Sequence, residues 1–220
     1  MIKRFYYWLH NRLSKQDERE EYSAGLWQDA LRQEALAQCR GAKGKLLEVG
    51  SGEGLFLSQL AMVNPGVELW GVDNSQERLR QAEYRFKEHH LSCPHFNLSD
   101  ASKLPFEDEF FDAVVCVNVF FNMPSAEVVK KVLLEMRRVC KKGGTIIFDF
   151  RNARNPFLRL KYKLAPLYDA TVKAIPLTTY HPKEIESMLR DAALRVTLRK
   201  PLGLGGLLFA PLILMKAERL

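Results

Sequence analysis

Cysteine is scarce in this 220-residue chain, and its pattern does not suit a disulfide framework or a zinc site. The four cysteines lie far apart and form no C-x-x-C pair: Cys39, Cys93, Cys116 and Cys140. We therefore expect ordinary buried thiols in a reducing compartment. The five histidines show no H-x-x-x-H spacing, so we expect no metal site.

Long apolar runs are also missing. The longest, residues 202–215, is interrupted by glycines and a proline, and it is shorter than the ~20 residues that a membrane-spanning helix needs. Residues 1–4 are followed by only a few apolar positions before His10, which does not suit a secretory signal. We expect a cytoplasmic protein, with peripheral contact to a membrane left open.

Length and charge set broad limits. A chain of 220 residues suits one α/β domain with a short extension, and it can bury a sizeable core without disulfides. The formal net charge of +7 indicates a basic surface. Such a surface suits nucleic acid, anionic lipid or phosphorylated substrates, and it does not choose among them.

A glycine-rich turn is the most informative stretch. The apolar run 46–49 ends in three alternating glycines, Gly50, Gly52 and Gly54, and residues 55–60 then follow with helical spacing. This pattern predicts a buried strand, a tight turn and the start of a helix. Glycine removes every Cβ from the turn, so a ligand can lie against the backbone near free helix N–H groups.

An acid lies one strand further along. Asp73 follows Gly54 by nineteen residues, at the end of a second apolar run, residues 67–72. A carboxylate there can accept two hydrogen bonds from a ribose diol. The turn and the acid together predict a nucleoside-containing cofactor at the first crossover of a parallel sheet.

The details of the turn favour one cofactor over another. The dinucleotide fingerprint G-x-G-x-x-G would place its third glycine at Leu55. Glu48 adds a carboxylate that would repel a pyrophosphate but could accept from an ammonium group. A cofactor with an amino-acid head and an adenosine tail therefore fits better than NAD, and a nicotinamide oxidoreductase is disfavoured.

Here the chain resembles the class I S-adenosylmethionine-dependent methyltransferases, in particular their type 11-like domain. Their first motif, E-x-G-x-G-x-G, matches Glu48, Gly50, Gly52 and Gly54, with Ser51 inside the turn, and Asp73 matches the acid that binds ribose. The resemblance implies a Rossmann-like three-layer α/β sandwich over residues 41–217. Its sheet would have seven mostly parallel strands and an antiparallel last strand.

The resemblance implies further cofactor residues. A third strand at 94–98 leads to Asp100, which would contact the adenine amino group, and to Ala101, whose N–H would read a ring nitrogen. Asp100 could equally cap the turn at 101–102. Asn74 joins this expected site and could also cap the following helix with Glu77.

The residues past the fourth strand, 110–117, are where methyl transfer would occur. Asn118 is the position most expected to meet cofactor or substrate. Cys116 lies inside the strand and is interpreted as core. Residues 117–120 lack the prolines of the N-P-P-Y motif of amino-methylating nucleic-acid enzymes, so we do not expect a nucleic-acid substrate.

The second half predicts the remaining elements of the sheet. A helix at 124–140 should end in a glycine cap within residues 141–144, followed by a strand at 145–150. A helix at 182–192 then leads to two closing strands, 194–200 and 207–217.

Residues 1–40 read as a helical extension or lid. Residues 1–15 form a basic, aromatic-rich amphipathic pattern that either packs on the domain or lies on a membrane surface. Residues 22–40 predict a second helix. Its aromatic residues Tyr22 and Trp27 are either part of a lid over the methionine end of the cofactor or simply core.

Residues 152–180 form an insertion that we expect to build the acceptor pocket, although a helical flap that merely covers the sheet is an equal alternative. Its aromatics, leucines and cations suit an apolar or amphipathic acceptor. Weak candidates for acid–base catalysis are Tyr168, Tyr180 and His181. His181 is also suited to cap the helix that begins at Pro182.

We therefore expect an S-adenosylmethionine (SAM)-dependent methyltransferase that acts on oxygen or carbon of a small-molecule or lipid-like acceptor. The cofactor half resembles the group that includes quinone-biosynthesis enzymes. Alternatives are an RNA methyltransferase, favoured only by the charge, and a non-catalytic SAM-binding subunit.

Overall fold

The computed structural model describes residues 26–168, 177–204 and 206–220. Seven strands form one sheet in the order β3-β2-β1-β4-β5-β7-β6. Every strand is parallel to the others except β7, which runs antiparallel to both of its neighbours. The strands are β1 Lys45–Val49, β2 Glu68–Asp73, β3 His95–Leu98, β4 Phe111–Cys116, β5 Cys140–Arg151, β6 Leu194–Leu202 and β7 Leu212–Arg219. The expected fold class is confirmed.

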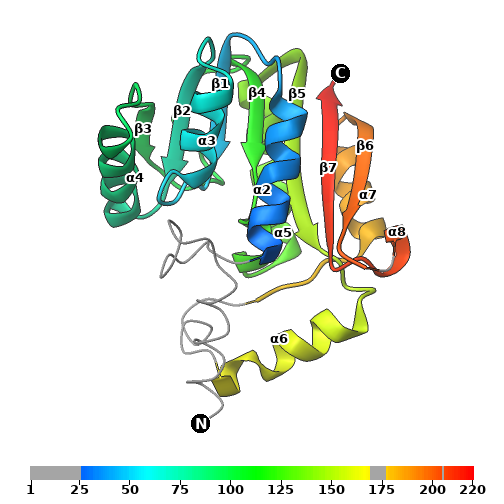
Figure 1. Cartoon of the computed structure of the whole chain (residues 1–220). Helices are drawn as coiled ribbons and strands as arrows, with labels where there is room; N and C mark the ends of the chain where they lie inside the picture. Colours follow the sequence, from blue (N-terminus) through cyan, green and yellow to red (C-terminus); the bar gives the residue numbers. More distant parts are fainter. Residues whose placement is uncertain (1–25, 169–176, 205) are drawn as a thin grey trace.

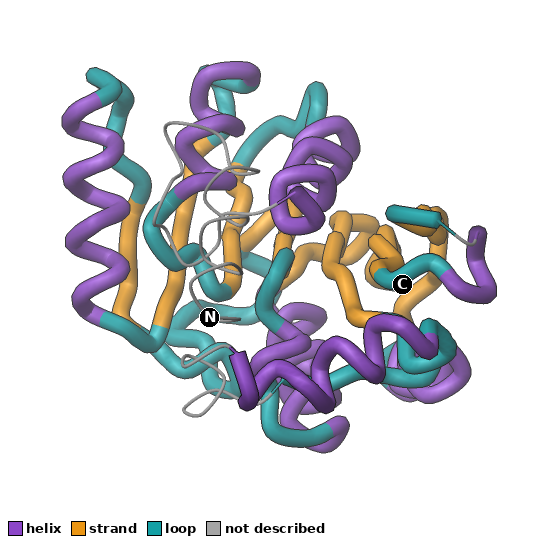
Figure 2. The backbone as a smooth tube through the Cα atoms, turned by 60° about the horizontal axis from the view of Figure 1, so that its bottom comes forward, coloured by secondary structure: helices purple, strands orange, loops and turns teal. Residues whose placement is uncertain are grey.

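Helices cover both faces of the sheet, as Figures 1 and 2 show. One apolar cluster joins α2, α3 and α4 to one face, and a second joins α5 and α7 to the other. Neighbouring residues of a strand alternate between the clusters, so the central strands are apolar on both faces. The helices are α2 Leu26–Cys39, α3 Leu55–Val63, α4 Gln76–Glu88, α5 Ala126–Val139, α6 Pro156–Tyr168, α7 Pro182–Asp191 and α8 Gly206–Phe209, with a 3-10 turn, η2, at Phe120–Asn122.

The carboxyl ends of the parallel strands meet at one edge of the sheet, the lower edge in Figure 1. Gly50, Asp73 and Asn118 follow the ends of β1, β2 and β4 there. Helix α6 follows β5 at the same edge. Ligands of open parallel sheets bind beyond this edge, so the fold brings the expected site residues together.

Three local predictions were wrong. Helix α5 passes directly into β5 at Cys140, and Gly143 takes its positive φ of 71° inside that strand rather than at the helix end. The register between β4 and β5 moves from Phe111–Cys140 to Ala113–Thr145, so the intervening residues form a bulge.

The other two wrong predictions concern the cap of α4 and the start of β7. The cap of α4 is Ser75, which accepts from the Arg78 N–H, and not Asn74. Residues 206–209 are helical, and β7 begins only at Leu212.

Of the cysteines, Cys93 is exposed and the other three are buried; all four thiols are free. Residues 1–25, and with them the expected surface helix and Tyr22, lie outside the described residues, as do residues 169–176 and the side chain of Tyr168. Trp27 is partly exposed, with Lys161 of α6 over its ring, so it is not core. No described helix combines the length and the apolar character needed to cross a bilayer.

Candidate active site

The three glycines of the turn after β1 have different surroundings. A Cβ built on Gly52 would meet nothing within 4 Å, and its φ is +51°. A Cβ on Gly50 would come within 2.4 Å of Val119, and one on Gly54 within 2.9 Å of Ala82. Only Gly52 therefore leaves open space for a ligand against the backbone. The other two are small so that the chain can pack closely.

Asp73 lies at the end of β2 and is almost completely buried. Its Oδ2 accepts from the Gly52 N–H at 3.0 Å, and its Oδ1 accepts from the Ser75 N–H at 3.0 Å. These two bonds hold the carboxylate between the glycine turn and the start of α4. Each oxygen has a further lone pair, which leaves the acid able to accept from a diol in the cavity.

Glu48 brings a second acid to the same place. It is 3% exposed, and its Oε2 is buried without a hydrogen-bond partner among the described residues, as is the hydroxyl of Ser51. Burial, followed by the nearby charge of Asp73, raises the pKa of Glu48 well above its usual range. A buried carboxyl oxygen without a partner is costly, and an ammonium group would satisfy it.

Asp100 follows β3 and is bonded locally. Its Oδ1 accepts from both the N–H and the hydroxyl of Ser102, each at 2.7 Å, and these bonds lower the pKa of the carboxyl. The capping alternative is thus realised. Asp100 and Ala101 nevertheless line the cavity, as does Asn74. Asp100 can therefore cap its own turn and still offer its other oxygen to a ligand.

Asn118 is held at the end of β4 in a left-handed conformation, with φ of 61°. Its N–H donates to Asp149 Oδ1 at 2.6 Å, and its side-chain oxygen accepts from Arg151 Nη2 at 3.0 Å. Its amide nitrogen donates to the carbonyl of Gln28 in α2 at 3.4 Å. Three hydrogen bonds, two to β5 and one to α2, therefore fix Asn118 at the cavity wall.

The support beneath Asn118 is a buried ion pair that the sequence did not predict. Arg151 and Asp149, both in β5, are nearly inaccessible to solvent and lie 2.5 Å apart. The guanidinium of Arg151 also stacks over the ring of Phe121, 4.3 Å from its centroid. The only signal in the sequence was an aspartate and an arginine among the apolar residues 146–151 at the end of the strand.

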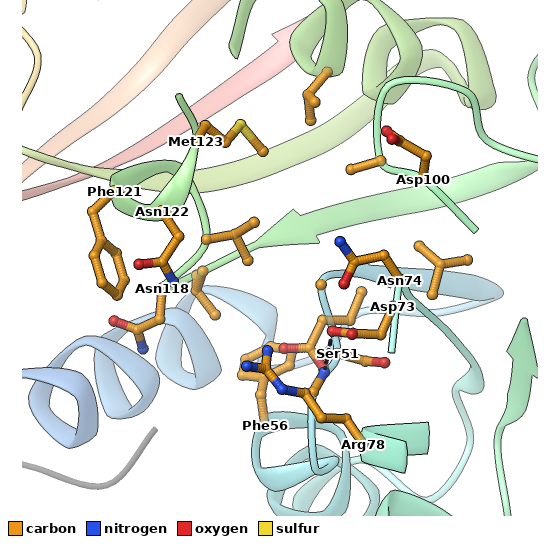
Figure 3. Close-up of a pocket in the computed structure, with 18 of the residues that line it drawn as sticks. Ser51, Phe56, Asp73, Asn74, Arg78, Asp100, Asn118, Phe121, Asn122 and Met123 are labelled. Atoms are coloured by element: carbon orange, nitrogen blue, oxygen red, sulfur yellow. Dashed lines mark hydrogen bonds between the residues drawn. The ribbon is translucent and has the colours of Figure 1, made fainter. Parts of the chain in front are cut away.

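Glu48, Gly52, Asp73, Asp100 and Asn118 all line one cavity of about 590 Å³. In Figure 3, Asn118, Phe121, Asn122 and Met123 lie on one side of it, and Asp73, Asn74 and Asp100 lie on the other. The expected cofactor residues all line the cavity except Gly54, which faces the packed helix α4 instead.

The three weak catalytic candidates are not among the described residues that line this cavity. His181 caps α7 by accepting from the Lys183 N–H at its Nδ1, which was the expected alternative. Tyr180 is buried, and its hydroxyl donates to the Phe120 carbonyl at 3.0 Å. Cys116 is fully buried in β4, and burial raises the pKa of its thiol, in keeping with a core residue.

The fold and the turn agree with known proteins. Residues 47–148 match the family model described as a methyltransferase domain. A SAM-dependent methyltransferase from Methanosarcina mazei has a similar structure, with a TM-score of 0.67 at 22% identity over 84% of this chain and 97% of that one. The magnesium protoporphyrin IX methyltransferase of Synechocystis, solved with bound SAH, gives 0.66 at 18% identity over 87% and 81%.

A curated relative matches over nearly the whole chain. The phosphatidylethanolamine N-methyltransferase of Cereibacter sphaeroides is 32% identical over 189 residues, which cover 85% of this chain and 88% of the relative. The open backbone at Gly52, the buried acid Asp73 and the unpartnered oxygen of Glu48 suit the nucleoside and the amino-acid head of SAM. The chain belongs to the S-adenosylmethionine-dependent methyltransferases, and SAM is its cofactor.

Proposed function

We propose that the chain transfers the methyl group of SAM to a lipid-like acceptor, and that the first acceptor to test is the amine of an ethanolamine phospholipid. The observation that carries the proposal is the long match to a phosphatidylethanolamine N-methyltransferase, which leaves little of either chain unmatched. The expectation of an oxygen or carbon acceptor is thereby extended to nitrogen.

The cavity wall supports an acceptor with an apolar part. Beyond Asn118 the wall is formed by apolar side chains of η2, the following loop and α5: Phe121, Met123, Pro124, Val128 and Val132. Concave apolar surfaces with a few polar groups are typical of small-molecule sites. In this proposal the polar groups hold the cofactor and the apolar wall receives the acceptor, with α6 of the 152–180 insertion beside it.

Bound SAM supplies a methyl group that its sulfonium already activates. The residues of this chain then have to bind, orient and exclude water. Glu48 would accept from the ammonium group, Asp73 would accept from the ribose diol, and the open backbone at Gly52 would leave room for the cofactor. Asn118, fixed by Asp149 and Arg151, forms the wall beside the acceptor.

An amine acceptor suits this arrangement because it provides its own lone pair once it has lost its proton. A hydroxyl or carbon acid would also need a base placed beside it. A carbon acceptor is the second candidate, because the ubiquinone/menaquinone C-methyltransferase of Bordetella avium is 33% identical over 127 residues. That match covers 57% of this chain and only 45% of the relative.

The test is a labelled-methyl transfer assay with the purified chain. We expect label from SAM in the lipid fraction when phosphatidylethanolamine is present, and none with phosphatidylcholine, whose nitrogen is already fully methylated. Label in a quinol and not in the phospholipid would select the second candidate. Label in RNA, or no transfer to any acceptor despite SAM binding, would favour the two alternatives that the sequence left open.

A further inference from the structure

The outward face of α6 carries exposed apolar side chains. Phe157, Leu160 and Leu164 are spaced three and four residues apart, so they form one stripe along the helix, and Phe157 is 80% exposed. The opposite face packs inward: Leu158 is 1% exposed, and burial raises the pKa of Tyr162, with the nearby guanidinium of Arg151 opposing the rise. Packing within the described structure therefore accounts for only one of the two apolar faces.

A second exposed apolar group lies beside the start of α6. Two amides bind the α8 region to this point: Asn152 Nδ2 donates to the Leu208 carbonyl at 3.1 Å, and Asn155 Nδ2 donates to the Phe209 carbonyl at 2.5 Å. The exposed side chains there are Leu204, Leu207, Leu208 and Phe209. We call these four residues, together with Phe157, Leu160 and Leu164, the α6–α8 surface.

The two segments that form this surface carry no acidic residue. Residues 152–168 contain no aspartate or glutamate but four cations: Arg154, Arg159, Lys161 and Lys163. Arg159, Lys161 and Lys163 are exposed on α6, and Lys161 lies over the ring of Trp27. Residues 201–215, which include α8, carry no charged residue. An apolar stripe flanked by lysine and arginine is the pattern of a helix that lies in a membrane interface.

We propose that the α6–α8 surface docks on an anionic lipid bilayer. The inference rests on the proposed lipid acceptor and adds the surface by which the chain would bind the membrane that contains this acceptor. Helix α6 lies at the carboxyl edge of the sheet (Figures 1 and 2), and the cavity residues Gly52, Asp73 and Asn118 lie at or just after strand ends at the same edge. A bilayer on its outward face would therefore hold phospholipid headgroups on the cavity side of the molecule. A second copy fits less well, because a symmetric contact would bring like cations together.

The experiment measures how the full chain partitions onto vesicles. One vesicle is equimolar phosphatidylcholine and phosphatidylglycerol, and the other is phosphatidylcholine alone. Two variants remove apolar groups, Phe157→Ser with Leu160→Gln on α6, and Leu207→Gln with Leu208→Gln beside it. A third, Arg159→Gln with Lys163→Gln, removes charge and leaves the apolar stripe intact.

The matched control is Met62→Gln, which changes an exposed apolar side chain in the last turn of α3. Because α3 begins at the carboxyl edge and runs back along the sheet, its last turn lies at the opposite edge. SAM affinity, measured for every variant, confirms that the domain is folded. The vesicle preparations and the protein concentration are the same throughout.

We expect the charge variant to lose about twenty-five-fold in partitioning onto anionic vesicles, because each of its two cations contributes about fivefold near the surface. Each apolar variant should lose about tenfold or more on the same vesicles, since its side chains no longer enter the interface. The Met62 control should partition like the unaltered chain. Unchanged vesicle partitioning of the folded apolar variants would overturn the proposal. The same holds if these variants lose self-association of the chain but keep their vesicle binding, because the surface would then bind a second copy.

Activity separates this proposal from the function on which it rests. The apolar variants should methylate phosphatidylethanolamine in vesicles more slowly but keep their rate on dihexanoyl phosphatidylethanolamine, which is dissolved as monomers. Equal losses on both substrates would contradict a docking role. If neither substrate is methylated by the unaltered chain, the proposed acceptor is wrong, while vesicle partitioning still decides whether the surface binds lipid.

Discussion

Replacing Glu48 by glutamine removes the ability of this buried side chain to become a carboxylate when SAM binds, and it keeps the volume of the side chain. The Oε2 of Glu48 has no hydrogen-bond partner among the described residues, and the side chain lies beside the glycine turn at the end of β1. If this oxygen accepts from the ammonium group of SAM, the variant loses a charge-assisted hydrogen bond. Such a bond contributes about 1.5–3 kcal/mol, so the Kd for SAM should rise about ten- to a hundredfold.

Calorimetry with two ligands makes the test specific. The first ligand is SAM, and the second is 5′-methylthioadenosine, which keeps the nucleoside but lacks the amino-acid head. Glu48→Gln should weaken SAM and leave methylthioadenosine within about twofold, a difference of less than 0.5 kcal/mol. An equal loss for both ligands would mean that Glu48 shapes the turn, and an unchanged SAM affinity would refute its assigned role.

The pH dependence gives an independent check on Glu48. Burial raises the pKa of its carboxyl, so the ligand-free folded chain holds this proton at pH values where the unfolded chain has lost it. Binding of an ammonium group favours the carboxylate, so SAM affinity should rise as pH increases through the raised pKa. Over the same window, from the ordinary glutamate value of about 4.3 upward, the contribution of Glu48 to the stability of the ligand-free chain should fall. Thermal melts of Glu48→Gln should lack that component.

Three further predictions concern the remaining parts of the site. Asp73→Ala should weaken SAM binding by more than ~1.4 kcal/mol, a tenfold loss in calorimetry, and unchanged affinity would refute the ribose assignment. Arg151→Met should lower the free energy of unfolding by about 3–5 kcal/mol in a urea titration, because it leaves Asp149 buried without its cation; a change below 1 kcal/mol would show that the pair is not needed. Deleting residues 1–15 should reduce flotation with anionic liposomes if they form the expected surface helix, and equal flotation would remove that idea.

The cofactor half of the fold could be predicted because its signals are local. β1 and β4 are short apolar runs that end in a turn. Because both faces of these strands are buried, the run itself identifies the strand, and the neighbouring strands need not be known. The glycine turn was equally predictable as a motif. The sequence could not show which of the three glycines faces the ligand space and which pack against the protein. That depends on Val119, which fills the space at Gly50, and on Ala82, which fills the space at Gly54, and both are far away in the sequence.

The prediction from the sequence was also wrong where two neighbouring residues were equally suited to cap the same helix. Asn74 and Ser75 are both good N-cap residues, and the geometry after Asp73 decided for Ser75. The junction of α5 and β5 was misplaced for a related reason. Gly143 and Gly144 suit a helix end, but Lys141 is held by Asp112 at the entry of β4, which draws the residues after Val139 into the sheet.

The part of the site that we propose for the acceptor depends on contacts that no short window of sequence contains. Arg151 ends β5, stacks on Phe121 after β4, bonds Asn118 and reaches Tyr162 on α6. One buried guanidinium therefore joins the cavity wall to the insertion whose outer face we assign to the membrane. A movement of α6 on binding lipid would act on Arg151 directly, and through it on the left-handed turn at Asn118. In the proposed function, the membrane-facing helix and the wall at Asn118 would thus be linked through Arg151, whereas the proposed cofactor cradle at Gly52 and Asp73 is built from β1 and β2 and would stay as it is.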